Sequence, residues 1–173
     1  MNRISKIEMD VTIRRYFENR MSDKLSVLDV GSYDVNGSLR DTMPPAWDYV
    51  GLDIVEGPNV DCVMNALGPL PVEDNSVDLV VSVSCFQYVK NPFKLAGWLH
   101  AALKPGGMII ICASHNESTG IMSLPVHLCP HQDKEFDCWR FKKYGMIAML
   151  EESGFNVLKA YYKGSNCWGV GIK

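Results

Sequence analysis

Short apolar runs alternate with polar, glycine-containing segments along most of the 173 residues. Seven runs have the length and residue types of strands, at positions 25–30, 49–54, 60–64, 77–83, 108–113, 155–162 and 167–172. The first five have the pattern of strands buried on both faces, and helical patterns such as residues 93–103 separate such runs. Buried runs joined by helices are typical of a parallel sheet with right-handed crossovers. The pattern predicts an α/β fold with a mostly parallel seven-stranded sheet and helices on both faces.

The two ends of the chain depart from this alternation. Near the N-terminus, apolar residues recur close to helical spacing between charged ones: Ile7, Val11, Ile13, Phe17 and Met21. This spacing predicts an amphipathic helix within residues 1–23 that covers the sheet edge or the ligand cleft. Near the C-terminus, a helical pattern over residues 144–153 precedes the last two strand-like runs. Only residues 163–166 join those runs, and so short a connection permits an antiparallel hairpin but no crossover.

Composition and charge narrow the class of protein. Apolar residues make up 47% and charged residues 21%, which is typical of a folded globular chain and of neither disorder nor a fibre. No linker or repeat interrupts the sequence, so we expect a single domain over residues 1–173, with one irregular insertion, 114–139, on the substrate side. The formal charge is −3 and the basic residues are scattered, which disfavours nucleic acid as a partner and favours a small molecule.

Cysteine spacing and the N-terminal residues bear on the compartment. The six cysteines show no disulfide-type spacing, which predicts reduced thiols. The N-terminal segment has no apolar run that could direct export or enter a membrane. These features predict a cytoplasmic protein without a membrane partner, and they leave its oligomeric state open.

Candidate chemistry begins where the first strand ends. Asp29 lies near the end of the run, Gly31 follows it, and Gly37 comes after a short polar segment. Glycines at this place allow a sharp turn from a strand into a helix beside a ligand, at the carboxyl edge where open α/β sheets bind ligands. Asp53 ends the second strand, where a carboxylate suits both hydroxyls of a ribose. Without a ligand, the same residues make a helix-entry turn, and Asp53 a cap or a solvated turn residue.

Further motifs follow in a recognisable order. After the third strand come Leu70 and Pro71, then Asp78-Leu-Val-Val after a turn, then Lys104-Pro-Gly-Gly. With the acidic strand end, this order resembles the class I S-adenosylmethionine-dependent methyltransferases, in particular the type 11 group, over residues 25–173. The resemblance implies a Rossmann-like fold, a methyltransferase that uses S-adenosylmethionine and releases S-adenosylhomocysteine, and no metal. It implies O- or N-methylation of a small-molecule acceptor by in-line transfer.

The resemblance also assigns residues to parts of the cofactor. Asp29 and Gly31 would lie beside its methionine part, Asp53 on the ribose, Asn65 and Ala66 at the adenine, and Phe86 nearby. The full set that it implies is Asp29, Gly31, Ser32, Gly37, Asp53, Ile54, Asn65, Ala66, Ser84 and Phe86. Two positions depart from the family pattern. Tyr33 stands where the second glycine is usual, which makes the loop to Gly37 longer, and Asn65 replaces an aspartate, which can still accept a hydrogen bond without charge.

The acceptor side is read from the irregular segment and the residues after it. Trp139 and Arg140 are the candidate substrate contacts, with packing of Trp139 and Phe141 under the sheet as the alternative. Asp137 would then cap a helix that carries Arg140. The candidates for a general base are His115, His127, His131 and Asp137. A zinc site from His127, Cys129, His131 and Cys138 is weighed and disfavoured, because their spacing matches no paired zinc motif.

Two other functions remain as alternatives. A non-catalytic module could keep the fold and bind the same cofactor as a regulatory subunit. A nicotinamide-dependent oxidoreductase fits the distance from the glycine turn to Asp53, although the turn is not G-x-G-x-x-G and no second half-sheet remains for the nicotinamide.

Overall fold

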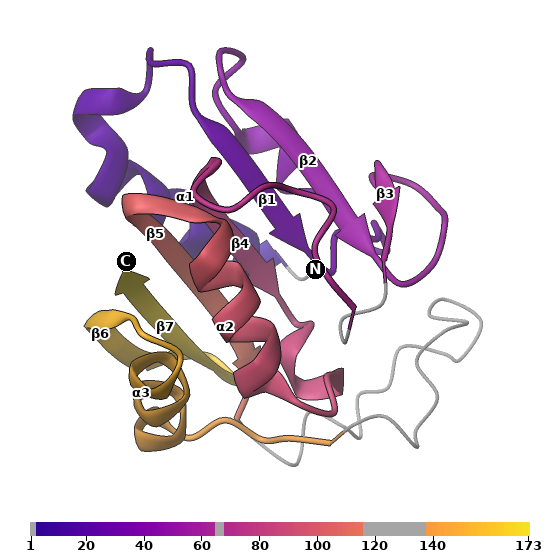
Figure 1. Ribbon diagram of the computed structural model, residues 1–173. Coiled ribbons are helices and arrows are strands. Elements are labelled where there is room, and N and C mark those ends of the chain that lie inside the picture. Colours follow the sequence, from indigo (N-terminus) through magenta and orange to yellow (C-terminus); the bar gives the residue numbers. More distant parts are fainter. Residues whose placement is uncertain (1–2, 65–67, 116–137) are drawn as a thin grey trace.

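One mixed sheet organises the molecule. The computed structural model describes residues 3–64, 68–115 and 138–173. Within them, seven strands form a sheet in the order β3-β2-β1-β4-β5-β7-β6, in which β7 alone runs against its neighbours. Figure 1 shows the order across the sheet, from β3 at one edge to β6 at the other. The predicted mostly parallel sheet and its antiparallel C-terminal hairpin are confirmed.

The elements lie close to the predicted ranges. The α-helices are α1 (Arg3–Phe17), α2 (Pro92–Ala102) and α3 (Lys143–Glu152), and three 3-10 turns are η1 (Glu18–Arg20), η2 (Arg40–Thr42) and η3 (Phe86–Tyr88). The strands are β1 (Ser26–Val30), β2 (Asp48–Asp53), β3 (Cys62–Val63), β4 (Val77–Val83), β5 (Leu103–Ser114), β6 (Asn156–Lys163) and β7 (Asn166–Ile172). β3 is shorter than predicted because only two of its residues pair with β2.

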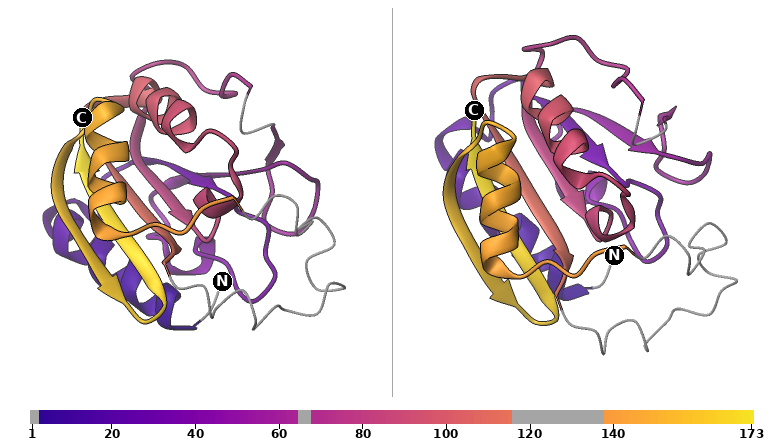
Figure 2. Two further views of the ribbon diagram at one scale, coloured as in Figure 1. Left: turned by 90° about the horizontal axis from the view of Figure 1, so that it is seen from below. Right: turned by 60° about the horizontal axis from the view of Figure 1, so that its bottom comes forward.

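Helices cover both faces of the sheet. α2 and α3 pack over one face, on a core that includes Leu99, Ile109 and Leu150. α1 packs over the opposite face, on a core that includes Met9, Ile110 and Trp168. Figure 2 shows the sheet between these layers. Because β4 is buried along its whole length, its near-continuous apolar sequence is the pattern expected of a central strand.

The N-terminal helix corrects one prediction. α1 lies across a face of the sheet and not over its edge, and its first turns reach the loop after β1, where Lys6 pairs with Asp41. Its buried stripe is Ser5, Met9, Thr12, Ile13 and Phe17, whereas Ile7 and Val11 are half exposed. Two polar contacts join the buried side of α1 to the C-terminal hairpin. Ser5 Oγ accepts a hydrogen bond from Asn166 Nδ2 at 3.0 Å, and Thr12 Oγ1 lies 3.2 Å from the Tyr161 hydroxyl oxygen. The buried side of α1 is thus the apolar stripe of Met9, Ile13 and Phe17 together with these two polar contacts.

The connections on the β2 side correct a second prediction. Neither the β1–β2 connection nor the described part of the β3–β4 connection contains an α-helix, so the glycine turn after β1 does not open one. Between β1 and β2 the chain instead makes the short turn η2, and its Leu39, Met43 and Trp47 cover the core beside β1 and β2. The β1–β2 connection is therefore irregular apart from η2, where the sequence predicted a helix.

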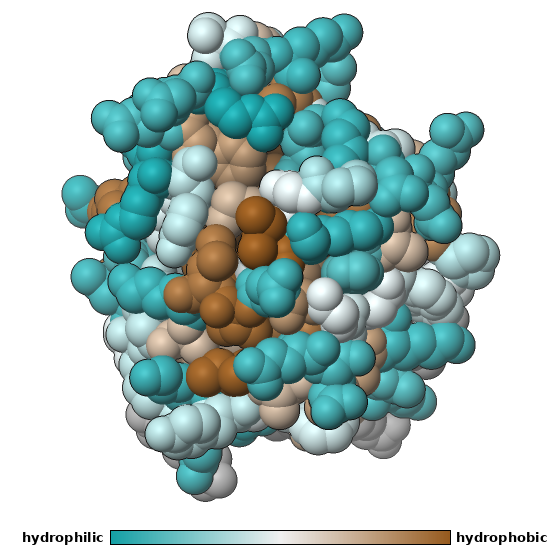
Figure 3. Space-filling view, turned by 60° about the vertical axis from the view of Figure 1, so that its left-hand side comes forward, coloured by the Kyte–Doolittle hydropathy of each residue, from teal (hydrophilic) through white to brown (hydrophobic). Residues whose placement is uncertain are grey.

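The β6 edge of the sheet carries features that hinder pairing with another strand. Lys159 and Lys163 place charge along β6, and its pairing with β7 shifts register between Val157 and Lys159. Charges and bulges are common on edge strands because they prevent a further strand from adding. Figure 3 shows the side of the molecule that carries β6 and β7, where apolar side chains form one patch surrounded by polar ones.

A buried carboxylate joins the amino-terminal ends of the central strands. Asp78 on β4 accepts hydrogen bonds from Ser26 N at 3.0 Å and Lys104 Nζ at 2.6 Å, and Arg20 Nη2 lies 3.4 Å away. Burial raises the pKa of Asp78, but these donors outweigh it and leave the pKa below its ordinary value. Asp78 therefore ties η1, β1 and β5 to β4.

We expect Asp78→Asn to lower the free energy of unfolding at pH 7 by about 1–3 kcal/mol, since its donors lose a charged acceptor. Because the Asp78 pKa is lowered in the fold, its stabilisation is present above the unfolded pKa and is lost as pH falls through the folded value. Urea unfolding at pH 7 and pH 3 checks both points. Asp10→Asn, which removes only a surface pair with Arg14, is the control and should change stability by less than about 0.5 kcal/mol. Equal effects at pH 7 would contradict the role of Asp78.

Candidate functional site

The carboxyl ends of β1, β2 and β4 meet at one place. Asp29 on β1 pairs with Gly51 on β2 and with Val81 on β4, so the residues that follow these strands lie side by side. The amide nitrogens of Gly31 and Ser32 both donate to Leu52 O, at 2.8 and 3.0 Å. These bonds fold the chain after β1 over the end of β2. The structure therefore brings Asp29, Gly31 and Asp53 together, as the sequence predicted.

Gly31 occupies a position that only glycine fits. Its φ is +84°, in the left-handed region that glycine adopts without strain. A Cβ added there would overlap the Cβ of Cys85 and lie 2.9 Å from its Sγ. The chain after β1 thus passes directly against the chain after β4, which leaves the backbone of the turn open to a ligand from the other side.

The longer loop after Gly31 is closed by an aspartate. Asp34 Oδ1 accepts a hydrogen bond from Gly37 N at 2.5 Å, and Gly37 has a φ of +109°. Gly37 therefore adopts the positive φ that the sequence predicted. Ser32 is buried and donates its hydroxyl to Asn59 O at 3.1 Å, so its side chain holds the loop and offers a ligand only its backbone.

Asp53 is held at the end of β2 by two backbone donors. Its Oδ2 accepts from Tyr33 N at 3.0 Å and its Oδ1 from Ile54 N at 2.7 Å. Each carboxylate oxygen has a further lone pair, so Asp53 can still accept hydrogen bonds from a ligand. Tyr33, at the position of a missing glycine, thus contributes its amide to orienting the predicted ribose acid. Ile54 is 55% exposed and presents an apolar surface beside it.

Asp29 is the most perturbed carboxyl group of this edge. It is buried, and the Tyr49 hydroxyl donates a hydrogen bond to its Oδ2. Burial raises the pKa of Asp29 to about 7, against the lowering effect of the Tyr49 hydrogen bond and the more distant Arg40 charge, and the charge of Asp53 raises it further. A carboxyl group in this state gains from a cationic ligand, because the positive charge would offset the cost of its burial.

Three residues around Asp29 carry no motif that predicts their place at this edge. Tyr49, Arg40 and Asn59 are linked to one another: the Arg40 guanidinium lies 4.4 Å from the Tyr49 ring centre, and Arg40 Nε donates to Asn59 Oδ1 at 2.8 Å. Tyr49 lay within a predicted strand, and Arg40 and Asn59 lay in polar segments without a motif. Only strand pairing could have shown the first, because β2 beside β1 places Tyr49 next to the residues that precede Asp29.

The ends of β4 and β5 hold two further predicted residues. Ser84 has a φ of +57° and its N donates to Cys112 O at 2.7 Å, which turns the chain sharply after β4. Phe86 in η3 is fully buried, and its ring centre lies 6.5 Å from that of Phe141. The Phe86 ring is therefore part of the core, and any contact with a cofactor would fall to the backbone around it.

The segment with the predicted substrate contacts docks on η3. Cys138 N and Trp139 N both donate to Gln87 O, at 2.8 and 3.1 Å, and Trp139 Nε1 donates to Val89 O at 2.9 Å. Trp139 keeps 40% of its surface exposed, while Phe141 packs in the core as the alternative reading had it. Arg140 precedes α3 and lies in no helix, which corrects the expectation of a capped helix that carries it.

Of the four predicted general bases, His115 lies within the described residues. The His115 ring follows β5, 4.6 Å from the Tyr162 ring, with Nε2 3.3 Å from Gly164 O. It therefore contacts the β6–β7 turn. His127, His131 and Asp137 lie outside the described residues, as do the predicted adenine contacts Asn65 and Ala66.

Comparison with known proteins identifies the family of the domain that contains this edge. A family model described as a methyltransferase domain matches residues 28–111, which hold β1 to β5 and both acids. The chain carries a methyltransferase domain. The match confirms the predicted resemblance to the class I S-adenosylmethionine-dependent methyltransferases of type 11. No curated protein matches the chain by sequence.

Solved structures show that the methyltransferase fold extends over the whole chain. An S-adenosylmethionine-dependent methyltransferase from Aquifex aeolicus is similar with a TM-score of 0.62 at 18% identity, covering 99% of this chain and 98% of its own. A chain from a Haloferax volcanii complex between the Trm112 methyltransferase activator and the putative methyltransferase gives 0.65 at 17%, covering 95% and 93%. Phosphoethanolamine N-methyltransferase 2 of Haemonchus contortus, in complex with phosphomonomethylethanolamine and S-adenosylhomocysteine, gives 0.67 at 16%, covering 96% and 52%.

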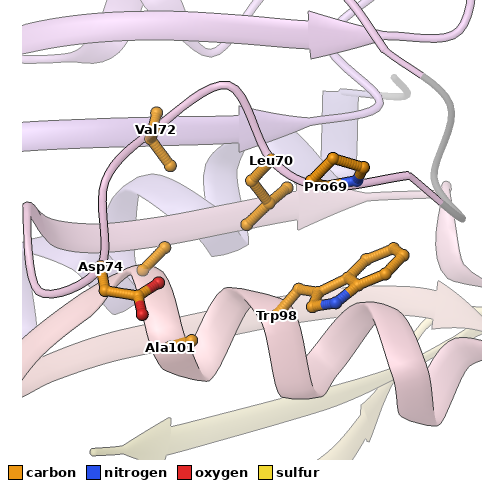
Figure 4. Close-up of a pocket in the computed structure, with 7 residues that line it drawn as sticks. Pro69, Leu70, Val72, Asp74, Trp98 and Ala101 are labelled. Carbon is orange, nitrogen blue, oxygen red and sulfur yellow. The ribbon is translucent and has the colours of Figure 1, made fainter.

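The methyltransferase domain has a surface hollow away from this edge. The hollow measures about 200 Å³ and lies between the chain before β4 and the second half of α2. Figure 4 shows Leu70 and Trp98 on its two sides, with Asp74 at one end. Because α2 ends where β5 begins, this hollow faces the amino-terminal side of the sheet. It shares no residue with the predicted cofactor set.

Metal-ligating groups and membrane-spanning helices are considered for the described residues. Residues 3–64, 68–115 and 138–173 contain no group of three metal-ligating side chains, and three of the four weighed zinc ligands, His127, Cys129 and His131, lie outside those ranges. No helix in the same ranges is long and apolar enough to cross a membrane.

Proposed function

We propose that the protein transfers a methyl group from S-adenosylmethionine to an oxygen or nitrogen of a small-molecule acceptor by in-line displacement. The observation that carries the proposal is the arrangement at the carboxyl edge of the sheet: a buried acid, a glycine turn without room for a Cβ, and a second acid held by backbone amides. The family match to residues 28–111 supports the reaction type.

The residues present fit this cofactor. Asp29 is a buried carboxyl group that a cationic amino group would neutralise. Asp53 has acceptor capacity for the two ribose hydroxyls, and the exposed Ile54 next to it offers an apolar surface for the base. The turn at Gly31 brings backbone, without a side chain, to the same place. Asp29 and the turn at Gly31 would hold the methionine part, Asp53 the ribose, and Ile54 the adenine.

The chain's own contribution to the reaction is chiefly positioning. The bound cofactor supplies an electrophilic methyl group on a sulfonium, so no Lewis acid is required. Holding the two reactants in line can supply several kcal/mol of the barrier reduction. A general base is needed only where the acceptor must lose a proton, and His115 remains a proposal for that role together with His127, His131 and Asp137.

The acceptor side is assigned to residues 114–139, with Trp139 and Arg140 as the proposed contacts. The half-exposed Trp139 ring is held at η3 by three hydrogen bonds, two from backbone amides and one from its own indole, and so forms a fixed apolar surface at the carboxyl edge. A small acceptor is supported by the acidic net charge and by the neighbour that holds phosphomonomethylethanolamine. The neighbour in the Trm112 activator complex makes a protein partner the second possibility to test.

Calorimetry with S-adenosylmethionine, S-adenosylhomocysteine and NADH tests the cofactor. We expect both sulfur compounds to bind and NADH to give no heat of binding. Asp53→Ala should weaken S-adenosylhomocysteine binding at least about tenfold, because hydrogen bonds to a charged group are worth about 1.5–3 kcal/mol each. Asp48→Ala, at the exposed opposite end of the same strand, should leave the affinity unchanged. Absence of binding by either sulfur compound would refute the proposal, and binding without methylation of any acceptor would favour a regulatory module.

A further inference from the structure

A tyrosine hydroxyl faces the buried acid of the cofactor site. Tyr49 on β2 donates its hydroxyl hydrogen to Oδ2 of Asp29 on the neighbouring strand. Asp29 is buried and Tyr49 partly buried, and burial together with the neighbouring Asp29 carboxylate raises the pKa of Tyr49 far above its ordinary value. Tyr49 therefore donates to Asp29 whenever Asp29 is ionised. It determines where one oxygen of Asp29 lies and leaves the other oxygen for a ligand.

The Tyr49 ring is fixed by a charged group on its face. The Arg40 guanidinium lies 4.4 Å from the ring centre, within the range of a cation–π contact. Arg40 is itself held by Asn59 and by Asp61, whose Oδ2 also accepts Gly51 N at 2.7 Å. The guanidinium is thus anchored to the strand that carries Tyr49. A ring clamped in this way loses little further freedom when its hydroxyl binds Asp29.

The same clamp reaches the glycine turn. Asn59 Nδ2 donates to Ser32 O at 2.9 Å and lies 3.3 Å from the Tyr49 hydroxyl oxygen. Asn59 has a φ of +68°, in the left-handed region, where asparagine is among the few tolerated side chains. One asparagine therefore links the tyrosine that orients Asp29 to the backbone that follows Gly31.

We propose that Tyr49 is a positioning residue for the cofactor, which holds the Asp29 carboxylate in its binding orientation. Arg40 and Asn59 act through Tyr49 by holding its ring and hydroxyl. The inference rests on the proposed function, because it takes Asp29 to face the cationic amino group of the cofactor. It adds residues and a pH dependence that the cofactor assignment alone does not contain.

The charges around Asp29 determine the direction of the effect. The groups that act on it are Tyr49 on β2, Asp53 at the end of β2, Arg40 in η2 and Cys85 after β4. Of these, the Tyr49 hydroxyl and the Arg40 charge favour the carboxylate, while Asp53 opposes it. Removal of the hydroxyl therefore leaves Asp29 protonated up to a higher pH. A protonated Asp29 attracts a cationic amino group far less than a carboxylate does.

Tyr49→Phe tests the proposal by calorimetric titration with S-adenosylhomocysteine between pH 6.0 and 8.5. We expect affinity about tenfold weaker at pH 7, a pH midpoint of binding shifted upward, and a smaller deficit at pH 8.5, where Asp29 ionises without the hydroxyl. Tyr161→Phe is the matched control. It removes a tyrosine hydroxyl that donates to Glu8 at 2.9 Å between β6 and α1, and it should change neither affinity nor midpoint.

Asp29→Asn separates this inference from the proposed function. If the unaltered protein binds no S-adenosylhomocysteine, the proposed function is wrong; if it binds and Asp29→Asn binds as tightly, Asp29 does not face the cofactor and the inference alone is wrong. If Asp29→Asn binds weakly but Tyr49→Phe matches the unaltered protein at every pH, the inference alone is overturned. Should Tyr49→Phe fail to fold, judged by its thermal unfolding, Arg40→Lys is measured instead. It removes the planar group from the Tyr49 ring, and the midpoint should rise in the same direction by a smaller amount; an unshifted midpoint overturns the proposal.

Discussion

Gly31→Ala is expected to abolish cofactor binding and to lower the free energy of unfolding by about 3 kcal/mol or more. A side chain at φ +84° is strained by about 1–3 kcal/mol, and the added Cβ would also overlap the Cβ of Cys85. The turn can only relieve this overlap by moving away from β4. Such a movement would displace the backbone between Asp29 and Asp53. Urea unfolding and calorimetry with S-adenosylhomocysteine measure the two effects.

Gly97 provides the matched control. It lies within α2 with nothing inside 4 Å of an added Cβ, so Gly97→Ala should stabilise the protein by about 0.5–1 kcal/mol and leave binding intact. Combining Gly31→Ala with Cys85→Gly removes the overlap but keeps the strained φ, and should restore part of the lost stability. If Gly31→Ala binds normally and unfolds like the unaltered protein, the close approach after β1 and β4 is not essential to the site.

Replacing Asp29 by asparagine should stabilise the protein without ligand at pH 8 by a few kcal/mol, at about 1.4 kcal/mol for each unit of pKa shift. The fold raises the pKa of Asp29 from its ordinary value to about 7, mainly through burial. Between about pH 4 and pH 7 the folded protein therefore holds a proton that the unfolded chain has lost. Stability must fall as pH rises through this window and then stay level. Asparagine avoids the cost and can still accept the Tyr49 hydrogen bond.

The measurement is urea unfolding of both proteins at pH 5 and pH 8 in the absence of ligand. The stability difference between the two proteins should be clearly smaller at pH 5, where Asp29 is protonated in the fold, than at pH 8. The same substitution should weaken S-adenosylhomocysteine binding, so stability and binding change in opposite directions. A stability difference that does not depend on pH would contradict the burial of an ionising Asp29.

Much of the sheet could be predicted because its central strands are buried on both faces. β4 shows this best: every residue from Val77 to Val83 is buried, and the sequence has no polar face to confuse with a helix. α2 carries its own start signal, since Asn91 accepts a hydrogen bond from Lys94 N and Pro92 follows it. The C-terminal hairpin could be predicted because the connection between its two strands, residues 163–166, is too short for a crossover. In each case the deciding information lies within about ten consecutive residues.

The orientation of α1 and the β1–β2 connection could not be predicted in the same way. Ile4, Ile7 and Val11 are apolar and spaced like a core stripe, yet they are half exposed. The buried side of α1 is instead the stripe of Met9, Ile13 and Phe17, which packs on strands far along the chain. After β1, Leu39, Met43 and Trp47 could have formed the apolar face of a helix. They are buried instead on a segment without an α-helix, which turns at Gly37.

The sequence by itself determined the order of strands and helices, the carboxyl-edge acids Asp29 and Asp53, and the glycine between them, because each depends on local periodicity or on a motif of adjacent residues. Tertiary structure alone decided the state of Asp29. Its burial, the hydroxyl of Tyr49 and the clamp of Arg40 and Asn59 come from segments 10 to 30 residues apart, and electrostatic effects on a buried carboxyl group depend on distance in space.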